Sequence, residues 1–223
     1  MRQQLSPRQK QLLYYLAEEQ IKNYSPISSA QIKEKYKLDF SPATIRHELF
    51  ELCQMEYLEQ PYTSAGRILS DWGWQVLIQD FLDNVFPDNL SISFNDIKDL
   101  TKYISKKTKS FSLAYNWKNN DIYTTGLEYI FNDKIINNTI HLYSIAKSID
   151  NIDNTILGIQ NILHDRQINV FIGKNNPLIH TKTFSFIATK SNNTNLIVGI
   201  ITPKVTRYEQ HFKIFKSLIN SLN

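Results

Sequence analysis

The chain has 223 residues, of which 42% are hydrophobic and 21% charged, with a net charge of +4 and one cysteine. This length can bury the core of one large domain or two small ones, and a single cysteine excludes an internal disulfide and a cysteine-based zinc cluster. The longest apolar run, Leu196 to Ile201, is too short to cross a bilayer, and the polar N-terminus is unlike a signal peptide. We therefore expect a cytoplasmic protein that makes no membrane contact.

Charge and composition change along the chain. Residues 1–75 hold nine basic and nine acidic residues, whereas residues 76–223 hold sixteen and twelve. Asn23 is the single asparagine of the first part, and the other twenty follow residue 75. Bulk charge therefore does not indicate a nucleic-acid partner for the first part, where only the placement of basic residues can do so. The change in composition predicts a domain boundary near residue 75.

Three helix-start signals occur in the first part. Ser6 and Ser41 each precede a proline at the first helical position, and Ser28 or Ser29 can cap a further helix. Apolar residues at helical spacing follow each signal. The predicted helices run from residue 7 to about 23, from 29 or 30 through 36, and from 42 to about 55.

The outer face of the third predicted helix suits a DNA groove. Near its N-terminus this face carries Ala43, Thr44 and His47, with Arg46 at the flank. Short side chains allow close approach, polar ones can hydrogen-bond base edges, and N–H groups at a helix start suit phosphate. An ordinary solvated helix face has a similar composition, so this helix alone leaves both interpretations open.

A hairpin is predicted after this helix. Its first strand, loop and returning strand cover residues 57–60, 61–66 and 67–69. Gly66 permits a backbone conformation with a positive φ, and Arg67 stands where a guanidinium can enter the minor groove. Thr63 and Ser64 offer hydroxyls to phosphate oxygens. A plain surface turn with a solvated arginine is the alternative, but three helices followed by this hairpin predict a winged helix-turn-helix.

The helix and hairpin together resemble a known family. SPATIRHELFEL (residues 41–52) and LEQPYTSAGRI (residues 58–68) match, at the same spacing, the DNA-binding domain of HrcA, the heat-inducible transcription repressor of bacteria. Two departures stand out. His47 occupies a position where the family usually has asparagine, and Glu56 occupies that of a customary turn glycine, where it is expected to strain the helix end.

The resemblance extends more weakly into the second part, at TTGLEYIF (124–131) and INVFIGKNN (168–176). It implies a GAF-like α/β dimerisation domain that is shorter than usual for the family. The apolar pattern agrees with an α/β domain. It predicts a helix that Ser70 caps, then strands, then a final helix that begins at Thr202 and Pro203. The capped helix is expected at 71 to about 84, and the strands at 169–172, 183–188 and 196–201.

The predicted fold class is therefore α+β. The expected domains are a winged helix-turn-helix DNA-binding domain at 1–75, linker helices at 76–110 and a reduced GAF-like dimerisation and regulatory domain at 111–223. By resemblance, the chain is expected to repress chaperonin and Hsp70 operons as a homodimer on a CIRCE-type inverted repeat of double-stranded DNA, with GroEL chaperonin as a further partner. The predicted DNA-binding residues are Ser41, Ala43, Thr44, Arg46, His47, Thr63, Ser64, Gly66 and Arg67.

An enzyme is not expected. The sequence has no phosphate loop, no paired nucleophile and base at motif spacing, and no metal-ligand set, so we predict no catalytic residue, cofactor or metal. His141, His164 and His180 are scattered, and an isolated histidine is usually a surface residue. The alternative function is a degenerate winged-helix regulator that binds protein or responds to a small ligand.

Overall fold

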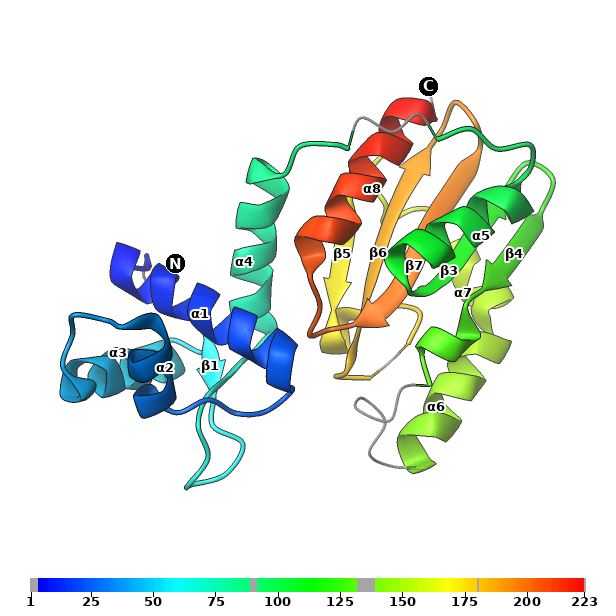
Figure 1. Ribbon diagram of the computed structural model, residues 1–223. Helices are drawn as coiled ribbons and strands as arrows, with labels where there is room; N and C mark the ends of the chain where they lie inside the picture. Colours follow the sequence, from blue (N-terminus) through cyan, green and yellow to red (C-terminus); the bar gives the residue numbers. More distant parts are fainter. Residues whose placement is uncertain (1–3, 89–91, 132–138, 180, 223) are drawn as a thin grey trace. The chain divides into compact units, whose positions relative to one another are not determined.

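A computed structural model describes residues 4–88, 92–131, 139–179 and 181–222, with the backbone alone for 139–142 and 144 (Figure 1). Helices and sheets are mixed along the chain, which confirms the α+β class. Contacts divide the chain into two units, residues 1–80 and 81–223. The three-part domain division expected from the sequence stays a prediction.

Unit 1 begins with three helices that start at the predicted serine caps. Ser6, Ser28 and Ser41 each accept a hydrogen bond at Oγ from the backbone N–H three residues later, over 3.2, 3.2 and 3.0 Å. This capping satisfies N–H groups that a helix start leaves without a partner. The elements of unit 1 are α1 (Pro7–Asn23), α2 (Ser29–Tyr36), α3 (Pro42–Gln54), β1 (Leu58–Glu59), β2 (Ile68–Leu69) and the start of α4 (Asp71–Asn84).

The end of α3 turns the chain sharply into β1. The Tyr57 N–H donates to the Leu52 carbonyl over 2.9 Å and the Glu56 N–H donates to the Cys53 carbonyl over 3.0 Å, a pair of bonds that defines a Schellman motif. Glu56 therefore adopts a left-handed conformation with a φ of 63°. The expected strain is confirmed, since this conformation costs a residue with a Cβ about 1–2 kcal/mol.

A single-residue bridge joins the segment between α1 and α2 to the root of β2. Ile27 N donates to the Arg67 carbonyl over 3.0 Å, and Arg67 N donates to the Ile27 carbonyl over 2.8 Å. A Cβ on Gly66 would lie 2.3 Å from the Ile27 backbone. Gly66 does not use the positive φ that a glycine permits. The glycine is required for this close approach and not for a left-handed turn.

A buried carboxylate connects α1 to α2. Glu19 is 6% exposed, and its oxygens accept hydrogen bonds from Lys35 Nζ over 2.6 Å and from Tyr36 Oη over 2.9 Å. Burial raises the pKa of Glu19, but the hydrogen bonds from Lys35 and Tyr36 and the charges of Lys35 and Lys22 outweigh it and leave the pKa below its usual value. The carboxylate therefore stays ionised and holds the two helices together.

Unit 2 is built on an antiparallel sheet. The described strands follow the order β4-β3-β7-β6-β5, and every neighbouring pair is antiparallel. The strands are β3 (Phe111–Asn116), β4 (Asp121–Thr125), β5 (Asn169–Ile172), β6 (Phe184–Ser191) and β7 (Leu196–Pro203). The helices are α5 (Ile97–Thr108), α6 (Thr139–Asp150), α7 (Ile152–Ile159) and α8 (Tyr208–Ser221), with short 3-10 turns η1 (Leu127–Tyr129) and η2 (Gly173–Asn175).

Helices cover both faces of this sheet (Figure 1). On one face, Phe111 and Leu113 of β3 share a core with Ile145 of α6 and Ile156 of α7. On the other face lie α5 and α8, where Tyr208 Oη and Ser185 Oγ of β6 are 2.7 Å apart. Burial on both faces explains why the central strand β7 reads as a nearly continuous apolar run.

The predicted start of the last helix is wrong. β7 continues through Thr202 to Pro203, which pairs with Phe184, and α8 begins only at Tyr208. Threonine followed by proline suggests a helix start, but a proline also fits the end of a strand, where its missing N–H costs no ladder bond. The final helix itself is confirmed, and its apolar residues Tyr208, Phe212 and Phe215 are fully buried.

We predict that Gly66→Ala destabilises unit 1 by about 1–3 kcal/mol, because the new Cβ overlaps the Ile27 backbone and must push the bridge apart. Urea unfolding followed by amide resonances of α1 and α3 measures this loss. Gly158→Ala is the control, since a Cβ there meets nothing within 4 Å and alanine favours a helix by up to about 1 kcal/mol. Equal stability of Gly66→Ala and the wild type would refute the close-approach role.

A buried histidine gives unit 2 a pH dependence. His211 Nε2 lies 3.1 Å from Thr206 Oγ1, and Nδ1 has no partner in the described part of the chain. Burial lowers the pKa of His211 from 6.5 to about 4. The folded state therefore keeps this imidazole neutral at pH values where the unfolded chain protonates it.

Stability of unit 2 should fall as the pH is lowered from about 6.5 to about 4, because only the unfolded state binds the His211 proton over that interval. Urea unfolding at pH 7 and pH 5, followed by methyl resonances of unit 2, should show a smaller pH effect in His211→Gln than in the wild type. The same pH effect in both proteins would exclude His211 as its source.

Candidate nucleic-acid interface

The interface begins with the N-terminal turn of α3. Ser41 Oγ accepts a hydrogen bond from Thr44 N over 3.0 Å and lies 2.9 Å from Thr44 Oγ1. Ile45, Leu49 and Leu52 are buried on the inner side of the helix. Because these residues fix the rotation of α3, its opposite side faces solvent.

The outward side chains of α3 are free to bind. Ala43, Arg46 and His47 are exposed, whereas Thr44 is half-buried and its hydroxyl is close to that of Ser41. Arg46 and His47 have no hydrogen-bond or ion-pair partner among the residues that the structure describes. An unpaired cation beside the first turn of a helix can meet an anion without first breaking an internal contact.

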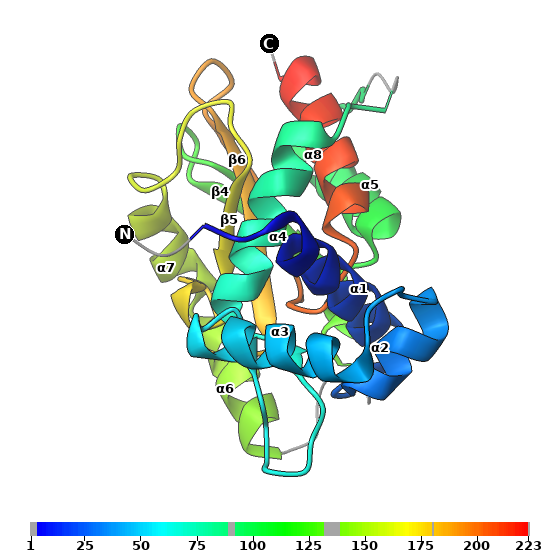
Figure 2. The same cartoon turned by 90° about the vertical axis from the view of Figure 1, so that its left-hand side faces the viewer.

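One glutamine fixes the conformation of the loop between β1 and β2. Gln60 Nε2 donates to the Thr63 carbonyl over 2.7 Å and to the Ala65 carbonyl over 3.0 Å. Thr63 and Ser64 are exposed at its tip. Figure 2 shows this loop extending away from unit 1 past α3. Gln60 was not among the predicted site residues, although it lies inside the motif that carries the family resemblance.

Arg67 lies at the root of the loop and not at its tip. Its side chain is half-buried, Nη1 donates to the Ala65 carbonyl over 3.3 Å, and Nε is buried without a hydrogen-bond partner in the described residues. Burial raises the pKa of the Cys53 thiol of α3, and the charge and hydrogen bond of Arg67 oppose that rise. Arg67 therefore touches both α3 and the loop.

In the structure, most of the predicted site residues fall into two groups, one at the start of α3 and one at the loop tip. Ser41, Ala43, Thr44, Arg46 and His47 share the start of α3, and Thr63 and Ser64 share the loop tip. Gly66 and Arg67 lie below them, where the bridge to Ile27 forms. The role of Ile27 was not predicted from the sequence. Ile27 forms a one-residue bridge from the short segment between α1 and α2, and a single residue shows no alternating pattern.

The histidines form no second site in the part of the chain that is described. His164 is exposed, the side chain of His141 and all of His180 lie outside the described residues, and no group of three or more potential metal ligands occurs within it. The described helices likewise include none that is both long enough and apolar enough to pass through a bilayer.

Comparison with known proteins decides the family. Residues 40–211 match the model of the HrcA protein C-terminal domain. The chain belongs to the HrcA family. The match starts at Phe40 and ends at residue 211, so this family model includes α3, the loop and most of unit 2.

Relatives named heat-inducible transcription repressor HrcA agree with this. The protein of Thermoanaerobacter pseudethanolicus is 37% identical over 108 residues, which cover 48% of this chain and 32% of the relative. That of Caldanaerobacter subterraneus is 42% identical over 87 residues, 39% of this chain and 25% of the relative. The matched regions thus span at most about a third of these relatives.

A solved structure shares the fold of this HrcA-family chain. The crystal structure of a hypothetical protein aligns over 98% of this chain and 96% of its own, with a TM-score of 0.77 and 18% sequence identity. At this identity the likeness establishes the fold alone.

In this HrcA-family chain, Gln60→Ala should loosen the loop without unfolding unit 1. The variant loses two hydrogen bonds, each worth about 0.5–1.5 kcal/mol, so the Ala65 amide, which donates to the Tyr62 carbonyl over 2.8 Å, should exchange with solvent roughly tenfold faster. Hydrogen exchange followed by NMR measures this rate. Gln54→Ala is the matched control, since Gln54 is exposed and without a described partner; equal exchange in both variants would contradict the role of Gln60.

Proposed function

We propose that unit 1 is a winged helix-turn-helix and that the chain represses transcription by binding double-stranded DNA. The observation that carries the proposal is the pairing of an exposed, unpartnered Arg46 and His47 on α3 with a projecting loop. The bridge of Ile27 to Arg67 supports it, because it adds a third, one-residue strand to the β1–β2 hairpin. Membership of a repressor family supports the same function.

In this proposal α3 enters the major groove with its N-terminal turn first. Ser41 fixes that turn, Ala43 allows close approach, and the exposed N–H groups meet a phosphate. Arg46 donates to a base edge or phosphate, while Thr44 and His47 influence which base is preferred. Since His47 replaces the asparagine usual in the family, its donor and acceptor pattern changes and so does its preferred base.

The loop acts as the wing. Thr63 and Ser64 offer hydroxyl groups to backbone phosphates next to the groove that α3 occupies. Gly66 and Arg67 contribute from the root, where the glycine permits the bridge and the guanidinium reaches both Cys53 and the loop. Arg67 can turn its remaining N–H groups to the minor groove, but its half-buried position makes support of the wing its larger role.

The finer part of the proposal concerns the operator and its regulation. An inverted repeat presents two identical half-sites, and a two-fold homodimer matches them with one interface used twice. We place that interface in unit 2, as a shortened GAF-like domain, and we propose a CIRCE-type repeat upstream of chaperonin and Hsp70 operons as the operator. Repression would require no cofactor and no catalysis.

The resemblance also suggests heat regulation through GroEL. A repressor of marginal stability loses its active fold on mild heating, since about 1.4 kcal/mol changes the folded-to-unfolded ratio tenfold. Operator binding should then fall after heating and return with purified GroEL and ATP. Full recovery without the chaperonin would remove GroEL from the account.

Two exposed aromatic residues favour an alternative partner. Phe50 on α3 is 50% exposed and Tyr62 in the loop is 61% exposed, and both suit a protein surface better than a phosphate backbone. In this alternative, the same helix and loop would bind a protein, and cationic contacts would matter less.

Fluorescence anisotropy with the inverted repeat from the organism's own chaperonin promoter separates the two functions. A repressor should bind this duplex at sub-micromolar concentration, much more weakly when one half-site is scrambled, and with an affinity that falls steeply as salt is raised. Absence of repeat-dependent binding in the full-length chain would refute the repressor and leave the protein-binding alternative.

Arg46→Ala should weaken operator binding by about 1–3 kcal/mol, the usual value of a good side-chain contact to a base. The lost discrimination is measured by comparing the operator with duplexes that carry single base changes. Lys22→Ala serves as the control, because it removes one positive charge that is already paired with Glu18 and Glu19. Equal losses in the two variants would show that only bulk charge matters.

A further inference from the structure

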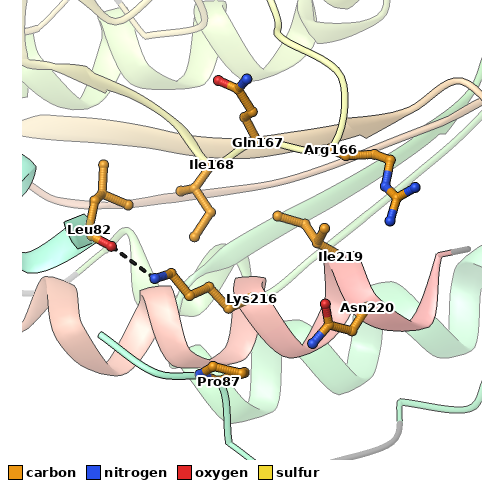
Figure 3. Close-up of a pocket in the computed structure, with 8 residues that line it drawn as sticks. All are labelled: Leu82, Pro87, Arg166, Gln167, Ile168, Lys216, Ile219 and Asn220. Atoms are coloured by element: carbon orange, nitrogen blue, oxygen red, sulfur yellow. Dashed lines mark hydrogen bonds between the residues drawn. The ribbon is translucent and has the colours of Figure 1, made fainter. Parts of the chain in front are cut away.

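A groove on unit 2 has the size of a small-molecule site. It lies between α8, the residues before β5 and the segment 82–87, and its volume is about 390 Å³ (Figure 3). Sites for small ligands commonly span about 300–1,000 Å³. The groove is separate from α3 and the wing, since its lining residues all belong to unit 2.

The middle of the groove is apolar. Leu82, Pro87, Ile168 and Ile219 line it. In Figure 3 the side chain of Ile219 lies between Lys216 and Arg166, and that of Ile168 points toward Lys216. Ile168 and Ile219 are half-buried. They therefore still expose apolar surface, and covering this surface with a ligand would be favourable.

One of the two cations is already engaged. Lys216 Nζ donates to the Leu82 carbonyl over 2.8 Å and also to the carbonyl of Val85. Leu82 lies in the last turn of α4, so the ammonium group satisfies carbonyls at the negative end of a helix. Two of its three donors are used in this way, and its charge is partly compensated.

Arg166 is the cation that remains available. Its side chain is exposed and has no hydrogen-bond or ion-pair partner among the described residues. The adjacent Asp165 uses its Oδ1 to accept a hydrogen bond from Asn192 N over 2.8 Å. No acidic side chain lines the groove in the described structure, so the lining carries positive charge without a matching negative one.

The backbone holds Arg166 in a fixed place. Its φ is 54°, a left-handed conformation that is unfavourable for arginine, and its N–H donates to the Lys190 carbonyl over 2.7 Å. A bridge between Asp165 and Lys190 fixes the preceding residue. Since the root of the side chain is anchored, little backbone entropy is lost when the guanidinium binds a ligand.

We propose that this groove binds a small amphipathic carboxylate. The carboxylate would accept two parallel hydrogen bonds from the Arg166 guanidinium, whose planar donors fit that geometry. A short aliphatic or aromatic body would cover Ile168 and Ile219. This binding activity is independent of DNA binding and goes beyond the repressor function.

Hexanoate is a suitable probe, with hexanamide as its neutral counterpart and acetate as the anion that lacks the apolar body. In a titration of the full chain followed by NMR, hexanoate should shift the amides of Arg166, Ile168 and Ile219. Hexanamide and acetate should each bind at least about tenfold more weakly than hexanoate. If hexanamide bound as tightly as hexanoate, the charge of Arg166 would have no role. If acetate bound as tightly as hexanoate, the apolar surface of Ile168 and Ile219 would have no role.

Two variants locate the site. Arg166→Gln should weaken hexanoate about tenfold, because it removes the guanidinium and keeps a side chain of similar length. Arg207→Gln is the matched control, since Arg207 is an exposed arginine of unit 2 outside the lining. The proposal would be overturned by equal losses in both variants or by no binding to the wild type. It would also be overturned by shifts that follow the protein concentration and not the hexanoate concentration, because these would assign the groove to contact between copies of the chain.

Discussion

The arrangement of unit 1 depends on the close approach of two backbones at Gly66. The bridge between Ile27 and Arg67 ties the segment before α2 to the strand that leaves the loop. It can form only because no Cβ stands between Gly66 and the Ile27 backbone. At the other end of the hairpin, the Schellman motif at Glu56 directs α3 into β1. The two connections hold helix and loop in one frame.

That frame separates supporting residues from binding residues. Gln60 and Arg67 both donate to the Ala65 carbonyl, so their polar groups are used in hydrogen bonds within the chain. Arg46 and His47 have no such partner in the described structure and face solvent. Because nine basic residues are balanced by nine acidic ones in residues 1–75, net charge does not attract DNA here. The proposed affinity comes from where the unpaired side chains of Arg46 and His47 lie.

Much of unit 1 could be predicted from local signals. Capping serines followed by apolar residues at helical spacing located α1, α2 and α3, because caps and amphipathic spacing act within a few residues. The bridge of Ile27 and the role of Gly66 could not be predicted from local signals, since both depend on two segments that are distant in sequence. The position of the Arg67 side chain could not be predicted for the same reason, since it folds back toward Cys53 of α3.

Unit 2 was harder to predict. β3 and β4 were not identified, and β7 was ended too early. β3 and β7 are buried on both faces and lack a clear alternation, and Pro203 imitates a helix start. β4 is an edge strand of exposed and half-buried residues with no apolar run to mark it. The buried His211 and the groove beside Arg166 also arise only after α8 packs on the sheet. Of the predicted binding residues, those on α3 were the most accessible to sequence reasoning, because one helix carries them all.

The central claim is that α3 and the wing bind DNA as one surface. An NMR titration of the full chain with the inverted-repeat duplex tests it most directly, since every backbone amide reports its own contact. The largest shifts should occur at Ala43, Thr44, Arg46 and His47 together with Thr63 and Ser64, at one common stoichiometry. Shifts confined to other parts of the chain, or shifts of α3 without the loop, would contradict it.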